Sequence, residues 1–157
     1  MSVVLLDANA VIMHGRTFGD RVRAAFESGH TLVLPQSVKQ ELVDEVLNTD
    51  DALANHRASA QSIQKLVDGG FLVLRSPNFE TYGHLIDEAR RCIADDSLPE
   101  HLIQADQYIP AIVCELAGEN SIQAVTADRK LREIIRNLAD RQGVGDHVSL
   151  RDPLTVL

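Results

Sequence analysis

Short runs of apolar residues alternate with longer segments of helical periodicity along the whole chain. The runs predict buried strands at residues 3–6, 31–35, 71–77, 122–128 and 147–150. The segments between them predict helices at residues 18–29, 36–47, 52–67, 79–93 and 129–139, with a further helix that begins near residue 106. Strands that alternate with helices form a mostly parallel sheet, because the crossover helices pack on its faces. The sequence therefore predicts an α/β fold with a five-stranded sheet.

Length and composition narrow the class of protein. A chain of 157 residues is the size of one domain, so we expect a single domain over residues 1–157. No apolar run approaches the roughly 20 residues of a membrane helix, and no secretory signal precedes the first strand. We therefore expect a cytoplasmic protein with no membrane partner. The formal net charge of −8 argues against a generic positive coat for nucleic acid, although the arginines occur in clusters.

Acidic residues lie where the predicted strands end or the following helices begin. Asp7 closes the first strand, and Asp128 closes the fourth, two residues after Thr126. Glu41 lies in the second turn of the helix after the second strand, and Asp106 lies near the start of a helix that leads into the fourth. Ligands of open parallel sheets bind at the carboxyl ends of the strands. We therefore expect the four carboxylates to meet at one end of the sheet.

Such a group of carboxylates indicates a particular chemistry. Crowded carboxylates repel one another, which raises their pKa values unless a cation lies among them. Oxygen ligands suit Mg²⁺ or Mn²⁺, and these ions activate water and stabilise the charge that develops during phosphodiester hydrolysis. Asn9 fits as an oxygen ligand or as a hydrogen-bond partner that orients Asp7, and Thr126 fits a similar supporting role. We expect each carboxylate to lie about 2–4 Å from a shared cation, directly or through water.

Each acid taken alone has a simpler interpretation. Asp7, Asp106 and Asp128 are all placed to act as helix N-caps, and Glu41 as a solvent-facing residue. The acidic pair at residues 95 and 96 reads as part of a polar loop. The histidines have no metal-like spacing and are interpreted as surface or hydrogen-bonded residues: His84, His101 and His147.

Four segments together resemble the signature blocks of PIN-domain ribonucleases. They are "VVLLDANAVI", "LPQSVKQELVDE", "ADQYIPAIVCELAG" and "AVTADRKLREI", in that order along nearly the whole chain. By this resemblance the four acids of the family fall on Asp7, Glu41, Asp106 and Asp128. Asn9 matches the polar companion of the first acid, and Thr126 matches the threonine of the family's T-x-D pattern.

The resemblance implies a three-layer α/β/α sandwich and Mg²⁺- or Mn²⁺-dependent endonuclease action on RNA, with the four acids as metal ligands and catalytic residues. In chains of this length it implies a VapC-like toxin that pairs with an antitoxin protein and forms a homodimer. Arg16, Arg129 and Lys130 are the candidates for contacts to the RNA. Two features depart from the family pattern: Ala8 replaces a common threonine, and the segment at residues 92–104 is longer than in minimal toxins.

Three other functions compete with this prediction. One is an RNA-processing PIN nuclease outside any toxin–antitoxin pair. Another is a PIN-like module that binds RNA or protein without cutting, although none of the four acids is missing. The third is a haloacid-dehalogenase-like phosphatase, because the segment "DANAV" is similar to the D-x-D motif of that class. In such phosphatases the second acid of the motif is the general acid and base, and in this chain Asn9 replaces it.

Overall fold

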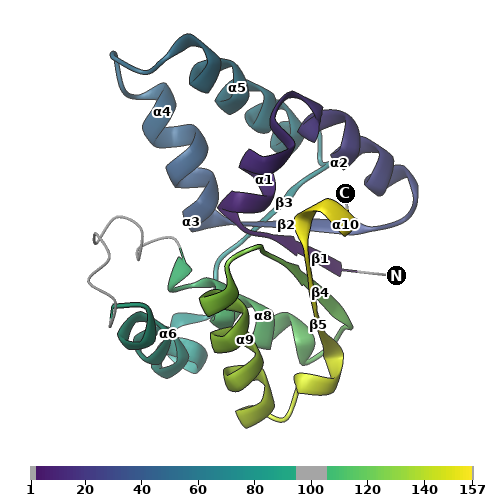
Figure 1. Ribbon diagram of the computed structural model, residues 1–157, viewed down its shortest axis with the longest axis vertical. Coiled ribbons are helices and arrows are strands. Elements are labelled where there is room, and N and C mark those ends of the chain that lie inside the picture. Colours follow the sequence, from purple (N-terminus) through teal and green to yellow (C-terminus); the bar gives the residue numbers. More distant parts are fainter. Residues whose placement is uncertain (1–2, 95–105, 157) are drawn as a thin grey trace.

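The computed structural model describes residues 3–94 and 106–156 and contains one parallel sheet (Figure 1). Its strands are β1 (Val3–Leu6), β2 (Thr31–Pro35), β3 (Val73–Arg75), β4 (Ile122–Val125) and β5 (Val148–Arg151). They lie in the order β3-β2-β1-β4-β5, and every neighbouring pair is parallel. The predicted five-stranded parallel sheet is confirmed.

Helices cover the two faces of this sheet (Figure 1). The first face carries α1 (Ala8–His14), η1 (Gly15–Thr17), α2 (Phe18–Glu27), α3 (Gln36–Lys39), η2 (Gln40–Asp44), α4 (Glu45–Leu47) and α5 (Ala54–Asp68). The opposite face carries α6 (Phe79–Ala94), α8 (Ile109–Ala117) and α9 (Arg129–Arg141). A short η3 (Gly145–His147) precedes β5, and α10 (Pro153–Val156) follows it and packs on α1. The three-layer α/β/α sandwich is therefore confirmed.

The core lies along the central strand. All four residues of β1 are buried, because β1 is flanked by β2 and β4 and covered by helices on both faces. Such strands read as continuous apolar runs, as "VVLL" does. Within the parts of the chain that the structure describes, no helix is long and apolar enough to cross a membrane.

Several element boundaries differ from the prediction. The helix α1 was not predicted, because its residues "ANAVIMH" carry apolar side chains on more than one side and show no clear amphipathic period. The fourth strand ends at Val125 rather than residue 128, since the following residues turn away from the sheet to start α9. The third strand is shortened at its start because the N–H groups of Phe71 and Leu72 donate to Leu66 O and complete the end of α5.

The segment before Asp106 lies partly outside the described residues. The predicted acidic loop with Asp95 and Asp96, and His101 within it, belongs to residues 95–105 and so lies outside them. The helix expected near residue 106 is α8, which begins at Ile109 and carries Pro110 in its first turn. A proline is tolerated there because the first N–H groups of a helix have no intrahelical partner.

Truncation of a central side chain tests the importance of β1. Leu5 is 1% exposed, so Leu5→Ala removes buried methyl groups and leaves a cavity. We expect it to lower the free energy of unfolding by about 2–5 kcal/mol in chemical denaturation. Leu154→Ala, at a side chain that is 67% exposed, should change it by less than about 0.5 kcal/mol. Equal effects of the two substitutions would contradict this description of the core.

Candidate active site

Two of the four acids lie at the point where the strand order reverses. Asp7 directly follows β1, and Asp128 follows the neighbouring strand β4 after a turn of two residues. Leu6 and Val125 are paired at the ends of the two strands, and Asp7 N–H donates to Val125 O at 3.3 Å. This reversal opens the crevice in which α/β sheets bind ligands. The structure therefore places both carboxylates in the crevice expected for a ligand.

Asp7 is a buried helix cap as well as a pocket residue. Its Oδ1 accepts a hydrogen bond from Ala10 N–H at 2.8 Å at the start of α1, and the side chain is 2% exposed. Burial raises the pKa of Asp7 above its ordinary value. Hydrogen bonds from the Thr126 side chain and from backbone N–H groups oppose that rise, while the charge of Asp128 adds to it. The capping interpretation of Asp7 is thus correct, and it is compatible with a site.

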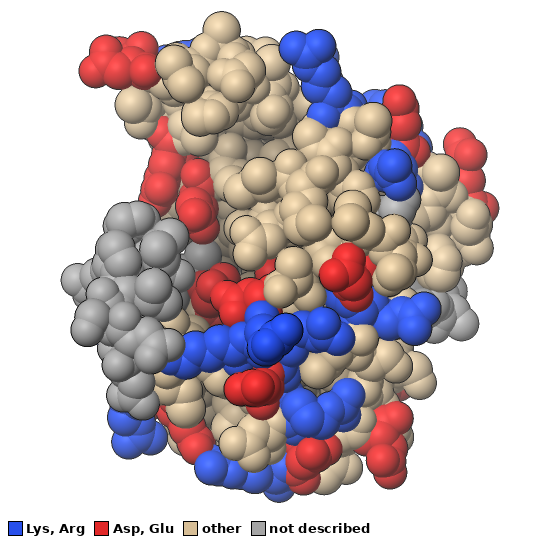
Figure 2. Space-filling view, viewed as in Figure 1, with Lys and Arg blue, Asp and Glu red and all other residues tan. Residues whose placement is uncertain are grey.

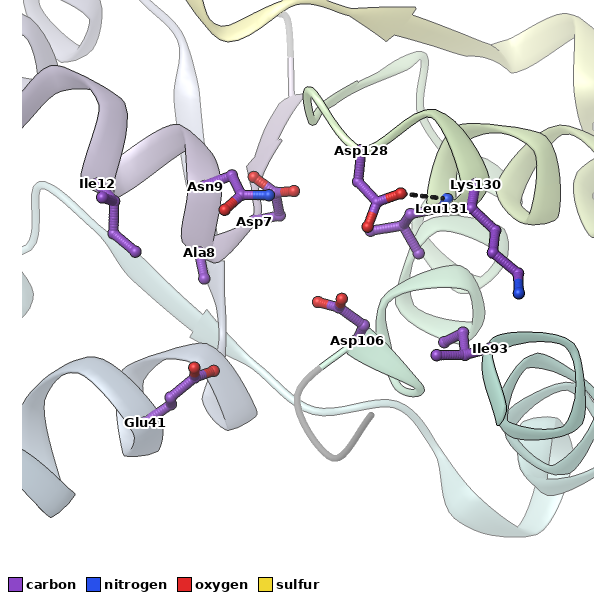
Figure 3. A pocket seen from close by; sticks show the side chains of 10 residues that line it. All are labelled: Asp7, Ala8, Asn9, Ile12, Glu41, Ile93, Asp106, Asp128, Lys130 and Leu131. Carbon is purple, nitrogen blue, oxygen red and sulfur yellow. Dashed lines mark hydrogen bonds between the residues drawn. The ribbon is translucent and has the colours of Figure 1, made fainter. Parts of the chain in front are cut away.

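Thr126 connects Asp7 and Asp128 through its side-chain hydroxyl group. Its side chain is buried, and its Oγ1 accepts a hydrogen bond from Asp128 N–H at 3.1 Å. The same hydroxyl is hydrogen-bonded to the Asp7 carboxylate, so it donates its single proton there. Asp128 in turn caps α9, with Oδ1 accepting from Leu131 N–H at 3.1 Å (Figure 3). One hydroxyl group therefore fixes the carboxylate of one strand end and the backbone of the other.

All four predicted acids line one cavity of about 330 Å³. In Figure 3, Asp7 and Asp128 lie on one side, Asp106 points towards them from the segment before α8, and Glu41 lies across the cavity on η2. The remaining lining residues are Ala8, Asn9, Ile12, Ile93, Lys130 and Leu131. Glu41 is therefore not on the opposite face of the sheet, a placement that would have excluded a common site.

The acids of this cavity interact electrostatically. Burial, together with the repulsion of three neighbouring carboxylates, raises the pKa of Asp106 to about 7. Those three carboxylates belong to Asp7, Asp128 and Glu41. A carboxyl group is stabilised in its neutral form when it is removed from water and placed beside like charges. The cavity therefore concentrates negative charge, which a cation would offset.

The donor atoms fit a hard divalent cation in kind, although they do not form a closed set of direct ligands. Four carboxylates and the Asn9 amide supply only oxygen ligands, which suit Mg²⁺ or Mn²⁺. Yet among the described residues no three His, Cys, Asp or Glu side chains lie close enough to hold one metal ion. The expectation that each carboxylate lies about 2–4 Å from a shared cation, directly or through water, stays a prediction. The four acids share a cavity without forming a closed cage.

The predicted basic residues separate into different places. Lys130 lines the acidic cavity. Arg129 lines an open groove on the outer side of α9, together with Arg132, which was not among the predicted residues despite its i,i+3 spacing from Arg129. Arg16 lines neither space; it borders a largely apolar cavity of about 630 Å³ between α1 and α5. The structure therefore does not bring Arg16 to the acidic cavity, because η1 turns its residues towards α5.

The two described histidines that the sequence interpreted as surface or hydrogen-bonded residues lie outside the acidic cavity. His147 Nδ1 lies 2.9 Å from Ala117 O, so His147 is a hydrogen-bonded histidine as predicted. His84 is exposed on α6. Neither lines the acidic cavity, so its donor set consists of oxygen atoms.

The raised pKa of Asp106 predicts how stability depends on pH when no divalent metal is present. Between the ordinary value of 3.8 and about 7, the folded chain binds a proton at Asp106 more tightly than the unfolded chain. Stability is therefore lost as pH rises through this range. We expect Asp106→Asn to reduce the fall of Tm between about pH 5 and pH 8 in EDTA, measured by circular dichroism. Asp87→Asn, at an exposed position of α6, should leave the slope unchanged, and equal slopes for Asp106→Asn and wild type would contradict the burial of this charge.

Comparisons with known proteins agree with this architecture. The sequence model of the family described as "Halobacterial PIN domain" matches residues 1–157. Among solved structures, a chain of VapBC2 from Rickettsia felis, crystallised with a DNA fragment from their promoter, matches with a TM-score of 0.53 at 12% sequence identity. The match covers 96% of this chain and 98% of that one, and at this identity it shows a shared fold alone. No curated protein is significantly similar. The family model and the fold together show that the chain belongs to the halobacterial PIN-domain family.

Proposed function

We propose that this protein is a metal-dependent endoribonuclease that hydrolyses phosphodiester bonds of RNA. PIN domains are generally nucleases, and the family assignment gives no support to the phosphatase alternative. The observation that carries the proposal is the acidic cavity: four carboxylates from four separate segments line it, and three of them raise the pKa of the fourth. Such a cavity has the ligands and the charge for Mg²⁺ or Mn²⁺.

The acidic side chains would hold the metal and orient the attacking water. Asp7, Asp106, Asp128 and Glu41 supply the carboxylate ligands, with the Asn9 amide beside Asp7 (Figure 3). A bound Mg²⁺ or Mn²⁺ lowers the pKa of water and stabilises negative charge on the phosphoryl group. Thr126 keeps Asp7 and the start of α9 in a fixed relation, since its hydroxyl contacts both. Asp106, whose pKa is about 7, exchanges its proton near neutral pH when the metal is absent.

The phosphate backbone of the RNA would follow the first turns of α9. A band of Lys and Arg side chains crosses this face of the molecule directly beside a group of acidic side chains (Figure 2). Lys130 lines the acidic cavity, and Arg129 and Arg132 line the groove on the other side of the same helix. Aromatic residues make up only 4% of the chain, which favours phosphate contacts over base stacking.

We further propose that the protein is the toxin of a toxin–antitoxin pair and acts as a homodimer with an antitoxin protein as its partner. The support is the VapC fold of the neighbour, which was crystallised within a VapBC complex. An RNA-processing nuclease with no antitoxin is the alternative. Expression of the protein alone and together with the product of the neighbouring gene distinguishes the two, since an antitoxin restores growth and a processing enzyme needs no such relief.

Replacement of the most buried of the four cavity acids tests the nuclease proposal. Asp7→Asn keeps the size of the side chain but removes a charge that would hold the metal, so we expect cleavage of single-stranded RNA with Mn²⁺ or Mg²⁺ to fall at least about a hundredfold. EDTA should abolish cleavage by wild type, and Asp87→Asn, on exposed α6, should cleave as wild type does. Equal cleavage by Asp7→Asn and wild type would indicate a contaminating nuclease. If the wild-type protein bound RNA but did not cleave it, a non-catalytic RNA-binding module would be favoured.

Removal of two arginines tests the path of the RNA. We expect Arg129→Ala with Arg132→Ala to raise KM without changing kcat, because both side chains lie outside the acidic cavity. The slope of log Kd against log salt for a short RNA should decrease by about 0.7 for each phosphate group that the variant no longer binds. Arg23→Ala is the matched control, since Arg23 stacks on Phe71 at the other end of the sheet. An unchanged salt slope in the double variant would exclude this path.

A further inference from the structure

The helix that carries Glu41 contains one wide turn. Between α3 and α4, the five residues of η2 form a π-helical turn, in which Glu45 N–H donates to Gln40 O five residues earlier rather than four. Turns of this kind are rare in helices and less stable than α-helical turns, and they often occur at functional sites. The segment that presents Glu41 to the acidic cavity therefore contains a turn that is less stable than a regular α-helical turn.

The burial of two valines accounts for the wide turn. Val38 and Val43 are both fully buried although they are five residues apart. In a regular α-helix, residues five apart point about 140° away from each other, so both could not face the same core. One extra residue in the turn brings them to the same side. The same turn directs neighbouring side chains into different cavities: Glu41 lines the acidic cavity, while Leu42 and Val46 line the largely apolar cavity between α1 and α5.

A partly buried ion pair spans the wide turn. Lys39 Nζ lies 2.6 Å from Asp44 Oδ1, and this pair has the same five-residue spacing. The Lys39 side chain is only 14% exposed and that of Asp44 37% exposed, so water screens the pair less than an exposed one. In a regular α-helix the two side chains would point apart for the geometric reason that applies to the valines.

From the wide turn, its buried valines and its ion pair, we infer that Lys39 and Asp44 are positioning residues: their ion pair holds the turn in the register that presents Glu41 to the acidic cavity. This inference rests on the proposed function, since it assigns to Glu41 a role in holding the metal. The two residues do not line the cavity, and they act through the backbone of η2. In a variant that lacks the pair, only the burial of the two valines still favours the wide turn over a regular α-helical turn.

Mn²⁺ affinity, measured by the electron paramagnetic resonance of the free ion, tests the inference without reference to cleavage. We expect Asp44→Ala and Lys39→Ala each to weaken Mn²⁺ binding on the order of tenfold, the lower end of the loss that follows removal of residues that orient a ligand. Asp44→Glu, which keeps the charge, should recover most of the affinity. Glu45→Ala, at an exposed position next to the turn, is the matched control and should bind Mn²⁺ as wild type does.

A double-mutant cycle identifies the residue through which Asp44 acts. If Asp44 acts through Glu41, then Asp44→Ala added to Glu41→Gln should cause no further loss of Mn²⁺ affinity. Additive losses, or an unchanged affinity in Asp44→Ala, would overturn the inference and leave the proposed nuclease standing. A lower Tm with wild-type Mn²⁺ affinity would assign the pair a purely structural role and overturn it as well. A wild-type protein that binds no Mn²⁺ would instead overturn the proposed function.

Discussion

The local structure must accommodate the repulsion among the carboxylates at one end of the sheet. Asp7 is almost completely buried, and its hydrogen bonds from Ala10 N–H and the Thr126 hydroxyl reduce the effect of that burial on its pKa without cancelling it. Asp106 has a pKa of about 7 because it is buried and three more acids surround it. The fold tolerates this repulsion because a large buried core stabilises the rest of the molecule. So much unfavourable charge in one cavity supports the proposal that a cation binds there.

Helix capping and metal binding do not exclude each other in this arrangement. Asp7 and Asp128 each follow a strand and begin a helix, so one oxygen caps the first turn by accepting from a backbone N–H. A carboxylate has a second oxygen and more lone pairs than the cap requires. The cap also restricts the rotation of the side chain, which fixes its direction relative to the crevice. The strand-to-helix junction therefore supplies a carboxylate oxygen that is already oriented towards the proposed metal site.

The parts of the fold that follow from local pattern were predictable, and those that depend on packing were not. Apolar runs such as "VVLL" predict the strands, and an acid at a strand end predicts a place in the crevice, because both are properties of neighbouring residues. The wide turn at η2 has no such signature, since Val38 and Val43 reveal it only once both are known to be buried. The place of Arg16 was not predictable either, because the direction of η1 depends on how it packs near α5. The spacing of the acids likewise depends on how four separate elements pack.

The open spacing of the acids is itself consistent with phosphodiester chemistry. Among the described residues, no three acidic, histidine or cysteine side chains close around one position, yet the cavity of about 330 Å³ has room for more than an ion. In proteins Mg²⁺ usually keeps several waters and is held by a few carboxylates together with substrate phosphates. A cage closed by protein ligands would leave no coordination position for a phosphate oxygen or an attacking water. Glu41 lies across the cavity from Asp7 on the wide turn, and under the proposed function the scissile phosphate would enter between them (Figure 3).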